Sequence, residues 1–146
     1  MNPEDLKLFA LLTEFSEEER ACLADVLETR ELPNGKSAFR EGSEGDGLVL
    51  LEAGRLRLKS RRTGDIVGVL EAQEHLGAAS LFALGKREVT ALADGPCTIS
   101  TLTRSGLSRL LDDSPRAAFR LAEAVLGELI GLTRASLDTL VEHAPD

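Results

Sequence analysis

The sequence has few aromatic and metal-binding side chains, and it contains neither tryptophan nor tyrosine. Its 146 residues include five phenylalanines, one methionine, two cysteines and two histidines. The core of the protein must therefore be built mainly from leucine, valine and alanine. Two cysteines and two histidines are too few ligands for an iron–sulfur cluster or a structural zinc site. We expect no metal centre, and the chain length suits one domain.

Positive charge is also scarce. The sequence has 17 basic and 25 acidic residues, which gives a net charge of -8. This negative charge disfavours direct binding to nucleic acid. No apolar run approaches the roughly 20 residues needed to span a bilayer, and the N-terminal segment is acidic where a signal peptide would be basic. Cys22 and Cys97 lie in separate apolar stretches, which predicts free thiols in a reducing compartment. We therefore expect a cytoplasmic protein with no membrane partner.

Residues 1–30 carry two helix start signals. Asn2 and Pro3 combine a cap with a proline at the first helical position. Ser16 and Glu19 have the spacing of a capping box, and apolar residues at helical spacing follow to about Arg30. This pattern predicts two short N-terminal helices.

Residues 31–103 change to the two-residue period of half-buried strands. In RLRLK, Leu56 and Leu58 should face a core, whereas Arg55, Arg57 and Lys59 should face water. Similar short runs alternate with turn sequences such as PNG, GSEGDG and RTGD. We predict a roll of about eight antiparallel strands. The basic run, which also includes Arg61 and Arg62, could bind an anion, but a solvated outer face is the favoured interpretation.

Helical periodicity returns in residues 104–146. A short amphipathic helix is predicted from Arg104, followed by a long helix that begins at Ser114–Pro115 and ends near Glu142. Its apolar stripe comprises Phe119, Leu121, Ala122, Val125, Leu126, Leu129, Leu132, Leu137 and Leu140, with Thr133 in the middle. A stripe this wide exceeds what one surface of the roll requires. We therefore expect a homodimer formed through this helix, or a different partner protein that docks there.

The order of glycines points to a known family. Gly35, the stretch EGSEGDG at 41–47, Gly54, the pair Leu76–Gly77 and Arg87 follow one another at characteristic intervals. This pattern resembles the cyclic nucleotide-binding domain, in the version found in catabolite-activator and FNR-type regulators. The resemblance implies a mainly β fold, a double-stranded jelly roll with N-terminal helices and a long C-terminal helix, as one domain over residues 1–146. Those regulators add a winged helix after the long helix; because this sequence ends at Asp146, we expect no DNA-binding domain.

The stretch LGAASLFALGKREVT resembles the phosphate-binding cassette of that family. The resemblance implies that backbone amides around Gly77, Ala78 and Ala79 and the guanidinium of Arg87 bind a cyclic phosphate. It also places Thr133 near the base, although a threonine that donates back to the carbonyl of Leu129 is the more ordinary interpretation. An alternative for Arg87, equally open from the sequence, is an ion pair with an acid such as Glu88 or Asp46.

Two positions depart from the cassette. Ala78 stands where the family has a glutamate that accepts a hydrogen bond from the ribose, a loss that typically costs about 1–3 kcal/mol. Glu88 stands where the family has a small or hydroxylated residue, and its charge opposes an anion. Both departures disfavour cyclic AMP or cyclic GMP bound in the usual way.

No Ser-His-Asp or Cys-His arrangement suggests catalysis, so we expect a protein that is not an enzyme. Two functions remain from the sequence. The first is a regulatory module that binds a nucleotide or another small anion and signals through its last helix. The second is a degenerate roll that serves dimerisation or protein–protein interaction.

Overall fold

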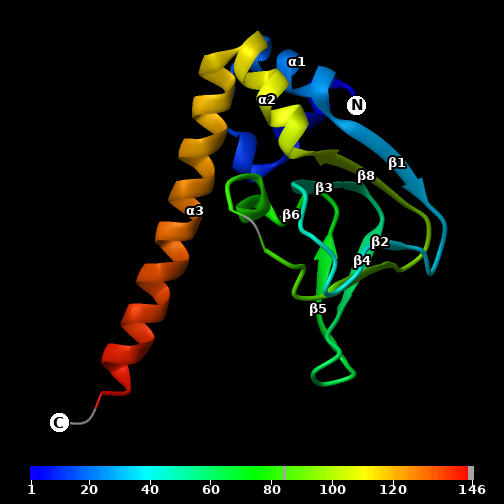
Figure 1. Ribbon diagram of the computed structural model, residues 1–146, viewed down its shortest axis with the longest axis vertical. Helices are drawn as coiled ribbons and strands as arrows, with labels where there is room; N and C mark the ends of the chain where they lie inside the picture. The colour runs from blue at the N-terminus through cyan, green and yellow to red at the C-terminus, as the bar shows by residue number, and fades with distance from the viewer. Residues whose placement is uncertain (84, 145–146) are drawn as a thin grey trace.

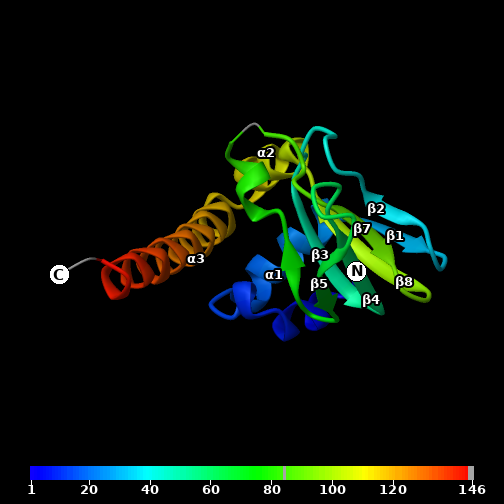
Figure 2. The ribbon, with the colours of Figure 1, turned by 90° about the horizontal axis from the view of Figure 1, so that it is seen from below.

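Eight antiparallel strands form the two four-stranded sheets of a β-roll (Figures 1 and 2). The computed structural model describes residues 1–83 and 85–144. The first sheet has the order β1 (Glu28–Leu32), β8 (Cys97–Leu102), β3 (Leu48–Ala53) and β6 (His75–Leu76). The second has the order β2 (Ser37–Phe39), β7 (Thr90–Ala93), β4 (Arg55–Lys59) and β5 (Ile66–Glu71). The predicted mainly β roll is confirmed.

Strand β3 separates two hydrophobic cores. Leu48 and Leu50 belong to a core shared with the helices, whereas Val49 and Leu51 belong to the core inside the roll. All four side chains are at most 2% exposed. Burial on both faces explains why this strand is a continuous apolar run rather than an alternating one.

Strand β4 follows its predicted alternation, although one outward side chain is less exposed than the others. Leu56 is fully buried and Leu58 half-buried, as expected for the inner face. Arg57, predicted to face water, is also half-buried, and its Nε is buried without a hydrogen-bond partner among the described residues. Arg57 nevertheless lies on the outer face of the sheet, as predicted, opposite Leu92 of β7.

A layer of helices closes one end of the roll (Figure 1). It comprises the 3-10 helices η1 (Pro3–Leu8) and η2 (Ala10–Leu12) and the α-helices α1 (Glu17–Val26), α2 (Arg104–Asp113) and α3 (Pro115–Glu142). The predicted caps are present: Asn2 accepts from the amide of Glu4, Ser16 and Glu19 form a capping box, and Ser114 accepts from the amide of Ala117.

The predicted end of the second N-terminal helix, near Arg30, was wrong. Helix α1 ends at Val26, Leu27 is extended, and β1 pairs with β8 from Glu28 onward. The roll therefore begins at Glu28 rather than at residue 31. The first four side chains of β1 are exposed, so no alternation of apolar residues marked the strand in the sequence.

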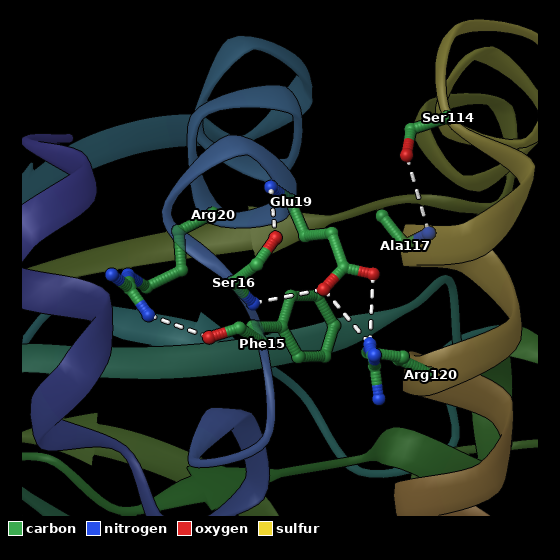
Figure 3. A network of polar contacts seen from close by, with 7 residues as sticks. All are labelled: Phe15, Ser16, Glu19, Arg20, Ser114, Ala117 and Arg120. Carbon is green, nitrogen blue, oxygen red and sulfur yellow. Dashed lines mark hydrogen bonds and ion pairs between the residues drawn. The ribbon is translucent and has the colours of Figure 1, made fainter.

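A partly buried ion pair joins α1 to the base of α3 (Figure 3). Both carboxylate oxygens of Glu19 lie 2.8 Å from Nε of Arg120, and one of them also accepts from the amide of Ser16 at 2.8 Å. Burial alone would raise the pKa of Glu19, but the hydrogen bonds from Ser16 and the charge of Arg120 hold it below its ordinary value. The pair therefore fixes the start of α3 against the helical layer.

Helix α3 buries side chains against the domain in its first three turns. Ala117, Ala118, Leu121 and Val125 are buried, whereas every described residue from 126 to 144 is exposed. Figures 1 and 2 show the rest of the helix projecting beyond the roll. Its exposed large apolar side chains are Leu126, Leu129, Ile130, Leu132, Leu137, Leu140 and Val141. The long helix is confirmed, and more than half of its length buries no side chain against its own domain.

Cys22 is half-buried and Cys97 is buried, and both are free thiols, as predicted. Among residues 1–83 and 85–144, no helix has the length and apolar character to traverse a bilayer. The same residues contain no cluster of three or more side chains suited to hold a metal ion.

Candidate functional site

The turn at Gly77 joins β6 to the short 3-10 helix η3 (Ala78–Leu81). Gly77 has a φ of 83°, in the left-handed region that favours glycine. A Cβ at this position would collide with Nη1 of Arg87 and lie 3.0 Å from the carbonyl oxygen of Gly47. The glycine is therefore required both by its backbone angle and by the close approach of Arg87.

The backbone of Arg87 is fixed by the loop that precedes β3. Its amide donates to the carbonyl of Ser43 at 2.8 Å, and its carbonyl accepts from the amide of Gly42 at 2.8 Å. A β-bridge between Glu44 and Lys86 extends this pairing by one residue. The arginine thus projects from a held strand-like segment rather than from a free loop.

The side chain of Arg87 turns toward the Gly77 turn. Nη1 donates to the hydroxyl of Ser80 at 3.2 Å, and Nη2 donates to the carbonyl of Gly47 at 3.0 Å. The guanidinium lies 4.4 Å from the centre of the Phe39 ring. Both of these acceptors are neutral, so they hold the arginine in place without neutralising its charge.

The charge of Arg87 has no carboxylate partner among the described residues. Neither Glu88 nor Asp46 forms an ion pair with it, and Asp46 instead accepts from the amide of Arg104 at 3.0 Å. Burial lowers the pKa of Arg87, and the nearby charge of Asp46 opposes that shift. Nε is buried without a partner in the described part of the chain. Of the two interpretations left open by the sequence, ion pairing with Glu88 or Asp46 is not what the structure shows.

Arg87 borders a pocket of about 350 Å³ between η3 and the second sheet. Its lining residues are Phe39, Leu58, Leu76, Gly77, Ala79, Ser80, Lys86, Arg87, Glu88 and Val89. Four of them, the two leucines, the phenylalanine and the valine, form apolar walls. Ser80, Lys86 and Arg87 supply hydrogen-bond donors, so the pocket combines an apolar part with a positive, donor-rich part.

Four of the six predicted site residues line this pocket, and two do not. Gly77, Ala79, Arg87 and Glu88 line it, and the side chain of Glu88 is exposed. Ala78 is only 7% exposed and packs into the core shared with the helices.

Thr133 lies on the exposed part of α3 and is not among the pocket residues. Its hydroxyl donates to the carbonyl of Leu129 at 2.9 Å, which is the more ordinary of the two interpretations that the sequence left open.

Three of the lining residues, Phe39, Ser80 and Lys86, were not predicted from the sequence as site residues. Phe39 could have been identified as an inward-facing residue of a strand that ends just before the glycine-rich loop. Ser80 is the one hydroxyl within three residues of Gly77, and it could have been paired with Arg87. Apart from its position next to Arg87, nothing in the sequence marks Lys86 as a site residue, because the direction of its side chain depends on the β-bridge to Glu44.

One contact connects the pocket wall to α3. Nε2 of His75 lies 2.9 and 3.0 Å from the two carboxylate oxygens of Glu128 on α3. His75 immediately precedes Leu76 and Gly77, which line the pocket. This contact joins the residue before the Gly77 turn to the part of α3 where the helix leaves the domain.

Comparison with known proteins agrees with this geometry. Residues 29–114 match the family described as "Cyclic nucleotide-binding domain". The chain is similar to the cAMP-dependent protein kinase regulatory subunit of Eremothecium gossypii, with 34% identity over 106 residues, which is 73% of this chain and 23% of that protein. The chain spans about a quarter of the length of the curated relatives it matches.

Solved structures show the same architecture. The N-terminal domain of a transcriptional regulator from Streptomyces coelicolor A3(2) has a TM-score of 0.77 and 27% identity, covering 86% of this chain and 90% of that one. The Catabolite Activator Protein of Thermus thermophilus has a TM-score of 0.73 and 27% identity, covering 90% of this chain and 62% of that one. The resemblance predicted from the glycine pattern and Arg87 is confirmed.

Proposed function

Because this chain belongs to the cyclic nucleotide-binding domain family, we propose that it is a non-catalytic regulatory domain that binds a nucleotide or another small anion in its roll and signals through α3. The observation that supports this proposal most directly is the state of Arg87. It is half-buried, held by neutral acceptors and without a carboxylate partner among the described residues. A charge prepared in this way favours an anionic guest.

The shape of the pocket suits a ligand with one phosphate and one flat apolar part. The N–H groups of Arg87 that Ser80 and Gly47 do not occupy remain for a phosphate oxygen, because a guanidinium has five donors. Lys86 adds a second cation at the same pocket. Phe39 and Val89 provide apolar contact area. Cyclic AMP and cyclic GMP are the first candidates, since relatives are named for cAMP dependence.

Two residues set a limit on the affinity. Ala78 has no acceptor for a ribose hydroxyl, and its methyl group is buried in the core rather than directed at the pocket. Glu88 places a carboxylate at the pocket, where it repels a phosphate. We therefore expect cyclic nucleotides to bind more weakly here than in a site with a ribose acceptor and a neutral residue at position 88.

The signal would reach α3 through His75 and Glu128. A phosphate that draws Arg87 away from Ser80 also shifts the turn that follows His75. Any ligand that changes the geometry of the His75–Glu128 contact then favours one orientation of α3 over another.

The output surface is the exposed apolar face of α3, which we propose forms a homodimer. Leu126, Leu129 and Leu137 are each more than 40% exposed, and they recur at helical spacing. A partner protein is the alternative occupant of this face. The free thiols of Cys22 and Cys97 fit the reducing cytoplasm, where we place the protein.

Isothermal titration of the chain with cyclic AMP and with cyclic GMP tests the ligand. We expect saturable binding to the wild type and a loss of about tenfold or more in Arg87→Gln, because charged hydrogen bonds are worth about 1.5–3 kcal/mol. Arg62→Gln is the matched control, since Arg62 is exposed and lies outside the pocket. Equal affinities of the two variants for the cyclic nucleotides would show that Arg87 does not bind the ligand.

The second function, a degenerate roll used for assembly, is favoured by Ala78 and Glu88 and by the exposed face of α3. Sedimentation of Leu129→Asp tests the interface, with Leu111→Asp on α2 as the control because Leu111 is similarly exposed. Dimers that are lost only in Leu129→Asp, combined with no heat from either nucleotide, would support assembly without ligand binding.

A further inference from the structure

A second hollow, larger than the Arg87 pocket, lies on the outer face of the second sheet. Its volume is about 640 Å³. We call it the basic bowl, and its lining residues are Gly35, Lys36, Ser37, Arg40, Lys59, Arg61, Thr90 and Leu92. Thr90 and Leu92 alternate with Ala91 and Ala93, which are buried inside the roll, so the bowl and the roll interior lie on opposite faces of β7.

The charge of the basic bowl is opposite to that of the whole protein. Four of its eight lining residues are cationic, namely Lys36, Arg40, Lys59 and Arg61, and none is acidic. The chain carries 25 acidic residues and 17 basic ones. A lining with four cations and no acidic residue is therefore not what the average composition of the chain predicts. The fold brings Lys36 and Arg40 from the two flanks of β2 to the basic run of β4.

Most of this charge is uncompensated. Among the described residues, the only ion pair of these four cations joins Arg61 to Glu41 at 3.7 Å, and the side chain of Arg61 remains 78% exposed. In contrast, Arg55 at the other end of β4 lies near both Glu71 and Asp94. The sheet therefore neutralises its basic face at one end and leaves it charged at the other.

Polar groups between the cations add donors to the bowl. The hydroxyl of Thr90 accepts from the amide of Glu41 at 2.9 Å and keeps its own proton to donate. Ser37 contributes a second hydroxyl. Arg57 lies on the same face, opposite Leu92, and its Nε is buried without a partner in the described part of the chain.

We propose that the basic bowl binds a compact polyanion with two or more phosphate groups. Guanidinium and ammonium groups meet there from the ends of two strands, β2 and β4, and two arginines can each bind phosphate in a bidentate way. A compact ligand is favoured over an extended polyanion because screening confines the attraction to about 8 Å at physiological salt. An extended chain would run onto a protein surface whose net charge is -8.

The basic bowl is independent of the ligand site proposed beside Arg87. Leu58 faces that pocket, whereas its neighbour Lys59 faces the bowl. A protein that fails to bind cyclic nucleotide can therefore still bind a polyphosphate here. The two proposals fail or succeed separately.

Amide chemical shifts of the full chain during titration with sodium tripolyphosphate test this proposal. At about 20 mM salt we expect saturable shifts of Lys36, Ser37, Lys59 and Thr90, and weaker binding at about 150 mM. Lys59→Glu should lower the affinity about tenfold. Arg62→Glu makes the same change of charge just outside the bowl and should lower it less than about threefold. Arg87→Gln changes only the other pocket, so it should leave the shifts of Lys36, Ser37, Lys59 and Thr90 unchanged.

Three results would overturn the proposal. Shifts confined to Gly77 and Arg87 would place the anion in the roll. Equal losses in Lys59→Glu and Arg62→Glu would show general charge attraction instead of a site. Tighter binding of an oligonucleotide or a poly-glutamate peptide than of tripolyphosphate would show that the bowl takes an extended polymer. Unchanged thermal unfolding of Lys59→Glu verifies that the variant is folded.

Discussion

Replacing Gly77 by alanine should reveal how tightly Arg87 packs on the cassette turn. Two costs arise at this position. An L-residue at a φ of 83° costs about 1–2 kcal/mol, partly offset by about 0.4–1 kcal/mol because alanine restricts the unfolded chain. The new methyl group would also collide with Nη1 of Arg87 and crowd the carbonyl of Gly47, and overpacking of this kind costs about 1–3 kcal/mol.

Gly95 separates the two costs. Its φ is 82°, and a Cβ there would meet nothing within 4 Å. Gly95→Ala should therefore destabilise the protein by about 1 kcal/mol, and Gly77→Ala by about 3 kcal/mol. In urea unfolding with a slope of about 2 kcal/mol per molar, the two midpoints should differ by about 1 M.

A third variant tests the cause. In an Arg87→Ala background, Gly77→Ala should approach the cost of Gly95→Ala, since only the contact with Gly47 remains. The same midpoint for Gly77→Ala and Gly95→Ala in the wild-type background would refute the close packing of Arg87 on the turn. The structural basis of the proposed anion site would be lost with it.

Three further outcomes are expected. Glu88→Ser should raise the affinity for cyclic AMP about five- to tenfold by calorimetry, because one repelling charge is removed; unchanged affinity would mean that Glu88 points away from the ligand. Because the pKa of Glu19 is lowered in the fold, its contribution to stability is present above its ordinary value of 4.5 and is lost as the pH falls through the lowered value. Glu19→Gln should therefore flatten the dependence of the urea midpoint between about pH 5 and pH 3, and a slope equal to the wild type would contradict this assignment. His75→Ala should leave nucleotide affinity within about threefold but abolish any ligand-induced change in the mobility of a spin label on α3; a persisting change would exclude His75 and Glu128 as the connection.

The sequence predicted the parts of the fold that depend on local pattern. The alternation of Leu56 and Leu58 marked a strand, and Ser114 and Pro115 marked the start of α3 to the residue. Strand β1 was missed because its first four side chains are exposed, and only its pairing with β8 makes it a strand.

The candidate site was predictable only where its residues are close in sequence. Gly77 and Arg87 are ten residues apart and follow a known spacing. Phe39, at the end of β2, and the carbonyl of Gly47, in the loop before β3, both contact the guanidinium of Arg87 although they are distant from it in sequence. The burial of Ala78 could not be foreseen either, since a small residue at the start of a 3-10 turn can face either side.

The last turns of α3 cannot depend on their own domain for order. From residue 126 onward every described side chain is exposed, and Glu128 contacts His75 of the roll at 2.9 Å. A helical segment of this length is marginal by itself in water, and Gly127 and Gly131 weaken it further. If α3 forms the proposed homodimer, dilution below its dissociation constant should unwind this segment, so that helicity measured by circular dichroism reports protein concentration as well as ligand.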